Sequence, residues 1–448
     1  MSDRLENLTQ ALLEAAAKAG AEAADAMAVD GSALSIDVRE GRLEQAERSE
    51  GVEIGLRVLI GGRQACVSAS DISPRTMAEM AKRAVAMARE APDDPHAGLA
   101  DPSQLARSWD IAALELADPS AEPSAADLER DALQAEAAAL AVPGVSKAQG
   151  ASAAYSRRAV HIAASNGFSG GYSRTSRHIS VTAISGEGLG MERDWAAESR
   201  IWQADLPAAA EIGTLAGQRA AARHGSRKPP TGAFPVLFDE RVANSLIGHL
   251  LAAINGSAIA RGSSWLRAAL GTQVLPAGLT LREDPHRVRI SGSRPFDAEG
   301  LPTRPRDIVA DGVLTGWTLD LATGRKLGMP STGNASRGTS APPSPGHSNI
   351  ALTQGRASRE ALIRDMGTGL VVTQLIGASI NPTTGDYSRG ASGFWVENGQ
   401  IAYPVNECTI AGNLREMLMR ITPANDARAH LSHVVPSLLV EGLTLAGA

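Results

Sequence analysis

Apolar residues at the start of the chain recur first at helical and then at strand spacing. Those of positions 5–16 fall on one face of a helix, and Gly20 stands where that helix would stop. Apolar and polar residues then alternate over 34–38 and again over 52–60. Such alternation is typical of antiparallel strands with one buried and one solvated face. Region 1–91 is therefore predicted to be an N-terminal α+β subdomain.

A second region repeats this combination of helices and strands. It follows a stretch rich in Pro, Asp and Ser at 91–123, which is typical of a linker. A helix is predicted over 124–140 and an Ala-rich helix over 206–223, with two short strand patterns between them. We interpret 124–223 as a second α+β subdomain. The polar, Pro-bearing segment 224–232 is the preferred major domain boundary.

The remainder, 232–448, predicts a β-rich C-terminal domain. It opens with a buried strand and a helix over about 240–254, and continues mostly as short strands and turns. Asn398-Gly399 between apolar strands predicts a hairpin turn, and Ala411-Gly412 a second turn. Strand–helix–strand repeats are scarce, which disfavours a doubly wound parallel sheet. The predicted fold class is α+β, with an N-terminal helix and antiparallel-sheet regions followed by this β-rich domain.

Composition narrows the classes of partner. The 448 residues carry a net charge of -6, and Lys and Arg occur in no cluster larger than short pairs. A polyanion needs a concentrated basic face, so nucleic acid is not expected as a partner. The 2 cysteines exclude a disulfide framework and a Cys-rich zinc ribbon. No apolar run reaches membrane-spanning length and no signal peptide is recognised, so the cytoplasm is the expected location.

The segments that could carry chemistry predict no catalytic residue on this chain. His430 and His433 are spaced for one helical face, but no Cys or carboxylate accompanies them, and zinc needs at least three protein ligands. Ser388 lies in a polar loop, predicted over 381–393, without a nucleophile elbow leading into a helix. Asp386 and Arg389 are expected to form an ion pair that stabilises this loop. No metal is predicted either.

Two polar loops, 331–338 and 381–393, are the candidates for contact with a ligand. Each is rich in small polar residues and carries one arginine. Such loops can offer backbone donors and acceptors to an extended peptide, while arginine binds a carboxylate or a carbonyl. Turn formation alone explains the same residues, and both interpretations stay open. The candidate substrate-binding residues are Thr332, Asn334, Ser336, Arg337, Asp386, Tyr387, Ser388 and Arg389.

Several of these segments together resemble the TldD/PmbA family. The resemblance covers most of the chain and is strongest over 311–414, in DGVLTGWTLDLATGRKLG, STGNASRG, GDYSRGASGFWVENG and TIAGNL. The string GDYSRGA at 385–391 is similar to the PmbA (TldE) branch in particular. Cys408, beside TIAGNL, departs from the expected pattern, and we interpret it as structural.

The resemblance also locates a helix in which TldD proteins carry His-Glu-x-x-x-His, a zinc-protease motif. If the first histidine corresponds to His249, Leu250 and Ile254 take the positions of the glutamate and the second histidine. If the shared Arg-Gly-Ser-Ser segment is used as the anchor, Ile247 and Ala252 take the positions of the histidines. None of these four side chains can bind zinc. An ordinary amphipathic core helix is therefore expected here.

What the resemblance implies is a subunit that pairs with a TldD-type protein to form a zinc-dependent protease. Such a complex degrades unfolded or flexible polypeptides and trims leader peptides. Zinc and general base are expected on the partner, with no cofactor on this chain, which would line the peptide groove. A homodimer in the partner's absence, binding peptides without hydrolysis, is the alternative, and an independent hydrolase with an unrecognised site is a third.

Overall fold

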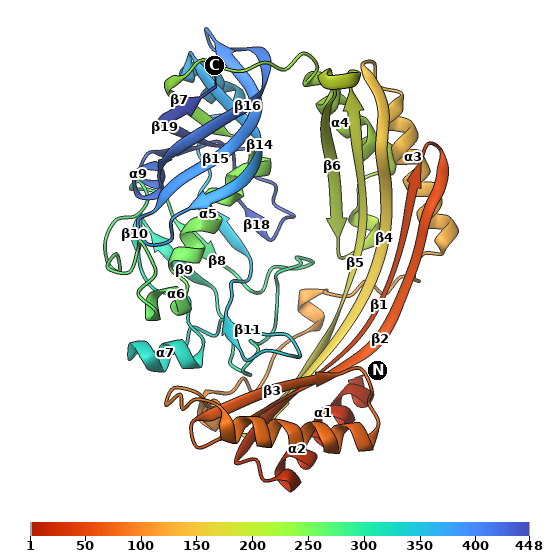
Figure 1. The fold of residues 1–448 in the computed structure, drawn as a ribbon, viewed down its shortest axis with the longest axis vertical. Helices are drawn as coiled ribbons and strands as arrows, with labels where there is room; N and C mark the ends of the chain where they lie inside the picture. The colour runs from red at the N-terminus through yellow and green to blue at the C-terminus, as the bar shows by residue number, and fades with distance from the viewer. Residues whose placement is uncertain (1, 448) are drawn as a thin grey trace.

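A long, twisted antiparallel sheet forms the N-terminal half of the computed structural model, which describes residues 2–447. Its six strands lie in the order β3-β2-β1-β4-β5-β6 (Figure 1). The two predicted α+β subdomains therefore share one sheet, joined where β1 pairs with β4. The strands are β1 (Ala23–Arg39), β2 (Arg42–Ile60), β3 (Arg63–Ala69), β4 (Val145–Ala164), β5 (Ser169–Ser185) and β6 (Glu192–Arg200).

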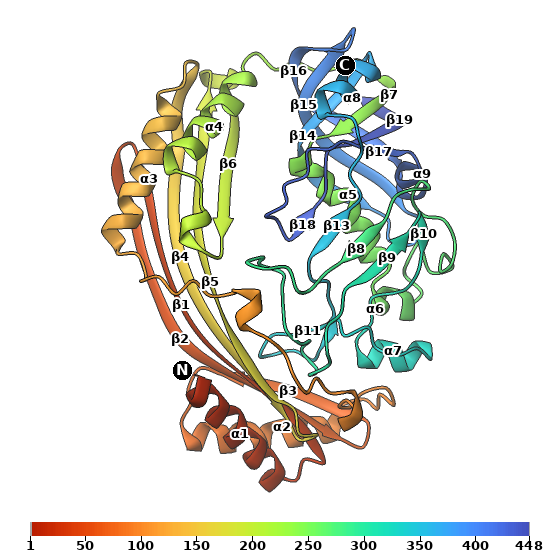
Figure 2. The same cartoon turned by 180° about the vertical axis from the view of Figure 1, so that it is seen from behind.

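Two pairs of helices cover opposite ends of this sheet, each over its own apolar core (Figure 2). In the first pair, Ser73 caps the second helix ahead of Pro74. In the second pair, Gly213 and Gly217 lie where any Cβ would collide with Ala135 and Ala139, so the two helices approach closely. The helices are α1 (Ser2–Ala19), α2 (Pro74–Glu90), α3 (Ala125–Leu140) and α4 (Ala209–Ala222).

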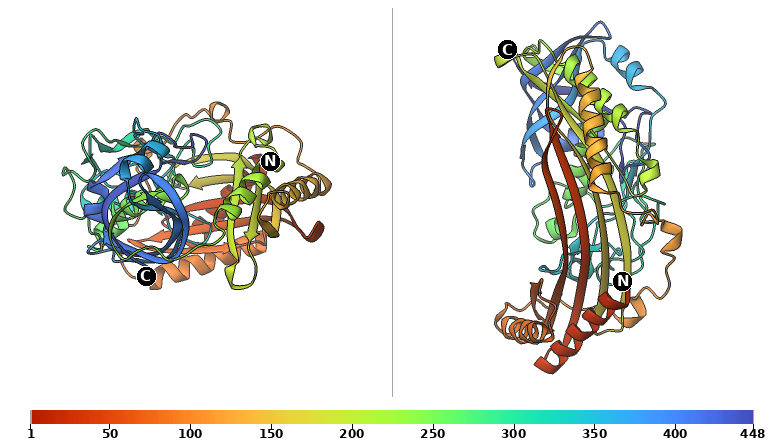
Figure 3. Two further views of the ribbon diagram at one scale, coloured as in Figure 1. Left: turned by 90° about the horizontal axis from the view of Figure 1, so that it is seen from above. Right: turned by 90° about the vertical axis from the view of Figure 1, so that its right-hand side faces the viewer.

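The C-terminal half contains a sheet that closes into a barrel. Its order is β16-β15-β14-β7-β19-β17, and an additional pairing between β16 and β19 completes the ring (Figure 3). Only the pairing of β14 with β7 is parallel among these strands. The strands are β7 (Gly232–Phe238), β14 (Gly369–Ile380), β15 (Asp386–Glu397), β16 (Gln400–Asn413), β17 (Ile421–Pro423) and β19 (Leu438–Ala446).

A smaller five-stranded sheet, β10-β9-β8-β13-β18, lies beside the barrel, and the largest apolar core joins the two through α5 (Glu240–Ala253). Over residues 2–447, no helix is both long and apolar enough to cross a membrane. The remaining elements are α6 (Gly256–Ala260), β8 (Leu281–Glu283), β9 (Arg306–Ala310), β10 (Val313–Leu314), α7 (Leu321–Leu327), β11 (Ala335–Ser336), β12 (Ser344–Pro345), β13 (Ile350–Leu352), α8 (Arg359–Met366), α9 (Leu414–Met419) and β18 (His433–Val434).

The α+β class is confirmed, but one predicted loop and one predicted turn are wrong. Asn398 and Gly399 have φ of 53° and 74° and join β15 to β16 as the hairpin turn predicted. The polar loop placed over 381–393 ends at Gly385, because β15 begins at Asp386. Gly412 lies inside β16, opposite Tyr387, and makes no turn.

Candidate functional site: the interdomain cleft

A cleft of about 1130 Å³ lies between the N-terminal sheet and the barrel. One wall comes from β4, β5 and β6, and the other from the start of α5 and from β14, β15 and β16. A second cavity of about 580 Å³ continues along β6 and shares Trp195, Arg241 and Asn244 with the first. We refer to the two cavities together as the interdomain cleft.

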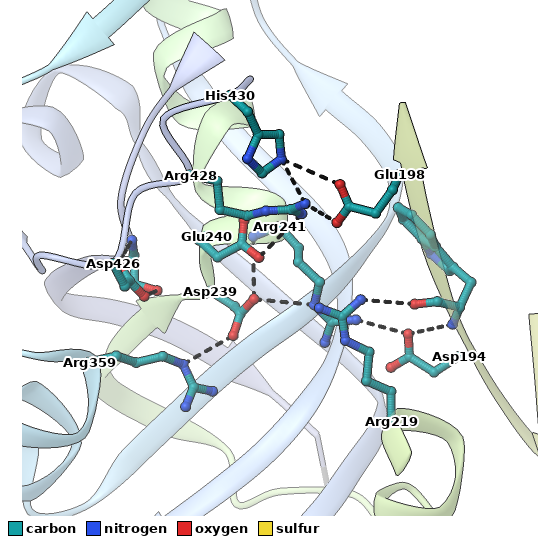
Figure 4. Close-up of polar contacts among 12 residues, drawn as sticks. Asp194, Glu198, Arg219, Asp239, Glu240, Arg241, Arg359, Asp426, Arg428 and His430 are labelled. Atoms are coloured by element: carbon teal, nitrogen blue, oxygen red, sulfur yellow. Dashed lines mark hydrogen bonds and ion pairs between the residues drawn. The ribbon is translucent and has the colours of Figure 1, made fainter. Parts of the chain in front are cut away.

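Ion pairs cross this cleft at the start of α5 (Figure 4). Arg241 Nη1 donates to Asp194 Oδ1 on β6 at 2.9 Å, and its Nε donates to Asp239 Oδ1 at 3.2 Å. Arg359 of α8 binds the other oxygen of Asp239 at 3.1 Å. Asp194 is 1% exposed, so Arg241 neutralises a carboxylate that has almost no access to water. This helix end therefore connects β6 to the barrel.

A second group of charges crosses farther along β6. Glu198 binds Arg428, and His430 Nε2 lies 3.4 Å from Glu198 Oε2. Burial lowers the pKa of His430, and the charges of Arg200 and Arg428 lower it further, against the opposing effect of Glu198. The two histidines considered as metal ligands are thus held by different partners, since His433 Nδ1 lies 2.9 Å from Asn244 Oδ1.

The floor of the cleft contains buried polar groups that have no partner. The hydroxyls of Thr373, on β14, and Ser392, on β15, are at most 3% exposed and form no hydrogen bond. Arg223 is equally buried, and only its Nη2 has a partner, Glu192 at 3.3 Å. Unpartnered buried donors of this kind are rare in folded proteins. They make the floor of the cleft polar just beneath its surface.

Cys408 also lines the cleft but is not placed to react. Its Sγ lies 3.1 Å from the carbonyl oxygen of Ala391, and the residue is 4% exposed. Burial raises the pKa of the thiol to about 11, so it stays protonated near neutral pH. This agrees with the structural role that the sequence predicts.

Basic side chains dominate the lining of the cleft. Five lysines and arginines line the first cavity and six arginines line the second, with Arg241 common to both, whereas each cavity has two glutamates. Five of the basic residues have no carboxylate within ion-pair distance among the described residues. These are Lys147, Arg174, Arg193, Arg219 and Arg389. The cleft is thus positively charged on a chain whose net charge is -6.

Helix α5 contributes no ligands for zinc. Leu250 and Ile254 are fully buried in the largest core, as is Ile247, and only Ala252 of the four motif positions is exposed. His249 packs edge-on against Tyr387 at 5.8 Å, and its Nε2 has no partner. No group of three or more His, Cys, Asp or Glu side chains between residues 2 and 447 is arranged to hold a metal ion. The Leu, Ile and Ala side chains at the four motif positions carry no atom that binds zinc.

The loop at 331–338, predicted to contact a ligand, lies away from the cleft. Several of its residues instead make hydrogen bonds or ion pairs within the protein. Thr332 Oγ1 accepts from Leu319 N at 2.9 Å, and Asn334 Nδ2 donates to Glu283 Oε1 at 2.8 Å. The side chain of Arg337 is fully buried and binds Asp25 of β1. Ser336 is exposed on β11. Loop 331–338 therefore lines neither cavity of the interdomain cleft.

The predicted residues of β15 divide between the two faces of the strand. Tyr387 is 2% exposed in the core and lines neither cavity of the cleft. Asp386 accepts from Thr384 Oγ1 at 2.6 Å and from Asn413 Nδ2 at 3.0 Å, so the predicted ion pair with Arg389 is wrong. Ser388 is half-buried. Arg389 alone of the eight lines the cleft, where its Nε donates to the carbonyl of Gly377 at 2.6 Å.

Sequence reasoning missed the residues on the opposite wall. Arg193 and Trp195 of β6, and Arg241 and Asn244 of α5, were not singled out. The available signal was the alternation within β6, which buries Asp194 and exposes its two neighbours on the other face.

Comparison with known proteins identifies the family of the chain. Three family models match it in succession: PmbA/TldA metallopeptidase domain 1 over 24–88, the central domain over 118–224, and the C-terminal domain over 231–447.

Individual relatives agree with this result. The chain is 37% identical to Metalloprotease PmbA of Escherichia coli O157:H7, over 92% of this chain and 90% of the relative. It is 36% identical to the Metalloprotease PmbA homolog of Haemophilus influenzae, over 97% of this chain and 94% of that protein. A crystal structure from Bacteroides thetaiotaomicron, of a protein named as a candidate modulator of DNA gyrase, superposes with a TM-score of 0.92 at 27% identity. It covers 100% of this chain and 99% of that one. The chain therefore belongs to the PmbA/TldD metallopeptidase family, and within it to the PmbA (TldE) branch.

Proposed function

We propose that this protein is the noncatalytic subunit of a heteromeric zinc metalloprotease, with a TldD-type protein as its partner. One observation carries the proposal: relatives over nearly the whole chain are named metalloproteases, yet helix α5 offers no set of metal ligands. A metalloprotease requires bound metal and a general base toward its water. We infer that the partner supplies both and that the complex acts on unfolded or flexible polypeptide, including leader peptides, in the cytoplasm.

In this proposal the chain binds and orients the substrate. Arg241 and Asn244, at the start of α5, and Arg389, on β15, face a cleft long enough for an extended segment. Buried hydroxyls on the floor, Thr373 and Ser392, can hydrogen-bond to backbone groups of the peptide. A peptide held in extended form has lost much of its conformational entropy before it reaches the catalytic centre of the partner.

The test is to purify the chain alone and together with its TldD-type partner, and to assay casein cleavage with and without a chelator. We expect cleavage only by the complex, and its loss on chelation. Zinc measured on each purified subunit should accompany the partner. Chelator-sensitive cleavage by the chain alone, or stoichiometric zinc bound to it, would overturn the proposal.

A second function is favoured by the presence of the whole cleft within one chain. In this alternative the protein is a stand-alone homodimer that binds peptides without hydrolysis. The same experiment separates the two, because the alternative predicts peptide binding by the isolated chain and no gain of protease activity with the partner. Chelator-resistant cleavage by the chain alone would instead indicate an independent hydrolase.

A further inference from the structure

We propose that the interdomain cleft selects acidic segments of extended polypeptide. This inference rests on the proposed function, because it takes a flexible polypeptide as the ligand, and adds the chemical class that the cleft prefers. It is carried by the excess of basic over acidic side chains that line both cavities. On a chain with net charge -6, such an excess concentrates the positive potential in one place.

The basic residues that lack a carboxylate partner lie on both walls. Arg193, on β6, and Lys147, on β4, are exposed on the side of the N-terminal sheet. Arg389 faces them from β15 of the barrel, and its one hydrogen bond is to a backbone carbonyl. A segment passing between the walls would therefore meet cations from two sides. Glutamate and aspartate side chains would pair with them in charge-assisted hydrogen bonds.

Burial of the floor strengthens this preference. Arg223 has two nitrogen atoms, Nε and Nη1, that are buried without a partner, and its one ion pair, to Glu192, is long at 3.3 Å. The charge of this guanidinium, which has only that one long ion pair, adds to the positive potential that attracts carboxylates into the cleft. Cationic peptides would meet like charge on both walls.

Nucleic acid is the competing anionic ligand, and the lining disfavours it. Single-stranded nucleic acid is generally held by several aromatic side chains on which the bases stack. Trp195 is the one Phe, Tyr or Trp residue that lines either cavity of the described chain. The buried hydroxyls of Thr373 and Ser392 can each donate and accept a hydrogen bond, which suits the amide and carbonyl groups of a peptide backbone. We therefore assign the cleft to polypeptide.

The experiment measures fluorescence anisotropy with two labelled flexible peptides of equal length, composed of Gly, Ser and Ala. One carries Glu at every third position and the other carries Lys. We expect the full chain to bind the acidic peptide about tenfold more tightly in low salt, with the difference shrinking as salt is added. Charge reversal on either wall, Arg193→Glu or Arg389→Glu, should remove most of this preference.

Arg83→Glu is the matched control, because Arg83 lies exposed on α2, outside the cleft. It makes the same change in net charge, so an equal loss of preference in this variant would overturn the proposal. Equal affinity for both peptides would also overturn it, as would tighter binding of an oligonucleotide. Circular dichroism confirms folding, and Arg193→Gln provides a milder variant. A complex that hydrolyses both peptides equally would refute the preference and leave the proposed protease role intact.

Discussion

The two halves of the molecule meet at two places that differ in character. At the first, which we call the docked end, loop 331–340 inserts against β1 and β2, and Phe296 packs edge-on against Phe168 at 5.0 Å. Asp25 there is buried between Arg57 and Arg337, with Arg57 Nε at 2.7 Å. At the second, the interdomain cleft, a few ion pairs such as that of Arg241 with Asp194 cross beside cavities that are lined by charged residues.

This difference indicates that the docked end holds the two halves together and that the cleft binds a ligand. The docked end pairs its buried charges, Asp25 with Arg57 and Arg337, although Arg337 Nη2 has no partner, and it also packs aromatic side chains against one another, which suits a permanent contact. The cleft leaves Arg193 and Arg389 without carboxylates, and the hydroxyls of Thr373 and Ser392 without partners. We infer that the docked end fixes the distance between the halves and that the cleft end is free to receive a ligand.

The largest predicted effect comes from Arg337→Met at the docked end. Burial alone would raise the pKa of Asp25, but Arg337 and Arg57 together lower it below its ordinary value. Removing Arg337 deletes its charge-assisted hydrogen bond to Asp25, while Arg57 still compensates the charge of that carboxylate, and we expect a loss of about 1.5–3 kcal/mol in the free energy of unfolding. Urea denaturation measures it.

Arg48→Met is the control for this prediction, because Arg48 pairs with Glu50 and Glu122 on the exposed part of β2. We expect it to change stability very little, since solvent screens such pairs. If the two variants lost equal stability, the docked end would be no more important than a surface ion pair.

Asp25→Asn should also reduce the dependence of the free energy of unfolding on pH in acid. The ionised carboxylate stabilises the fold above pH about 3.9, and this contribution is lost as pH falls through the lower native pKa of Asp25.

The next effect in size concerns the cleft end in weak acid. Burial lowers the pKa of both His430 and His433 from the usual 6.5. Their neutral forms therefore stabilise the cleft end above pH about 6.5, and this contribution is lost as pH falls through the native pKa. After correction for intrinsic rates, we expect amide exchange in β6 to accelerate about threefold at mildly acidic pH. β1 at the docked end should stay protected.

The variant His430→Gln combined with His433→Gln provides the control for the acid effect. It retains side chains that can hydrogen-bond and removes both titrations, so exchange in β6 should no longer depend on pH. Equal acceleration in β1 and β6 of the natural protein would contradict the distinction between the two ends.

Local elements of this fold could be read from the sequence because their signals are local. Ser73-Pro74 marks a helix start, and Asn398-Gly399 marks a turn with positive φ at both positions. Closure of the barrel through β16 and β19 could not be read from the sequence, because no local signal relates the segments that pair at Thr409 and Ala446. The single sheet shared by the first two subdomains escaped prediction for the same reason.

The charge of the cleft is hard to predict for the same reason, because its residues are brought together only by folding. Lys147, Arg193 and Arg389 are distant in sequence, so no basic cluster is visible along the chain. Folding brings them to one cavity, while most of the negative charge stays elsewhere. The absence of a basic run therefore says little about a basic surface. Conversely, the glycine-rich string around Tyr387 identifies the family but places most of its side chains outside the cleft.

The smallest expected effect, from Tyr387→Phe, tests that last assignment. The hydroxyl is buried and interacts with Arg389, which keeps its bond to the Gly377 carbonyl in the variant, so we expect a change in stability within about 1 kcal/mol. Burial raises the pKa of Tyr387 to about 12 against the opposing charge of Arg389, so its ultraviolet ionisation signal should appear only in strong alkali. Peptide affinity should stay unchanged, whereas Arg389→Glu, two residues along the same strand, weakens it. If Tyr387→Phe weakened peptide binding as much as Arg389→Glu does, Tyr387 would be a contact residue, as the sequence predicted. The conformation that binds peptide would then differ from this one, in which Tyr387 lies in the core.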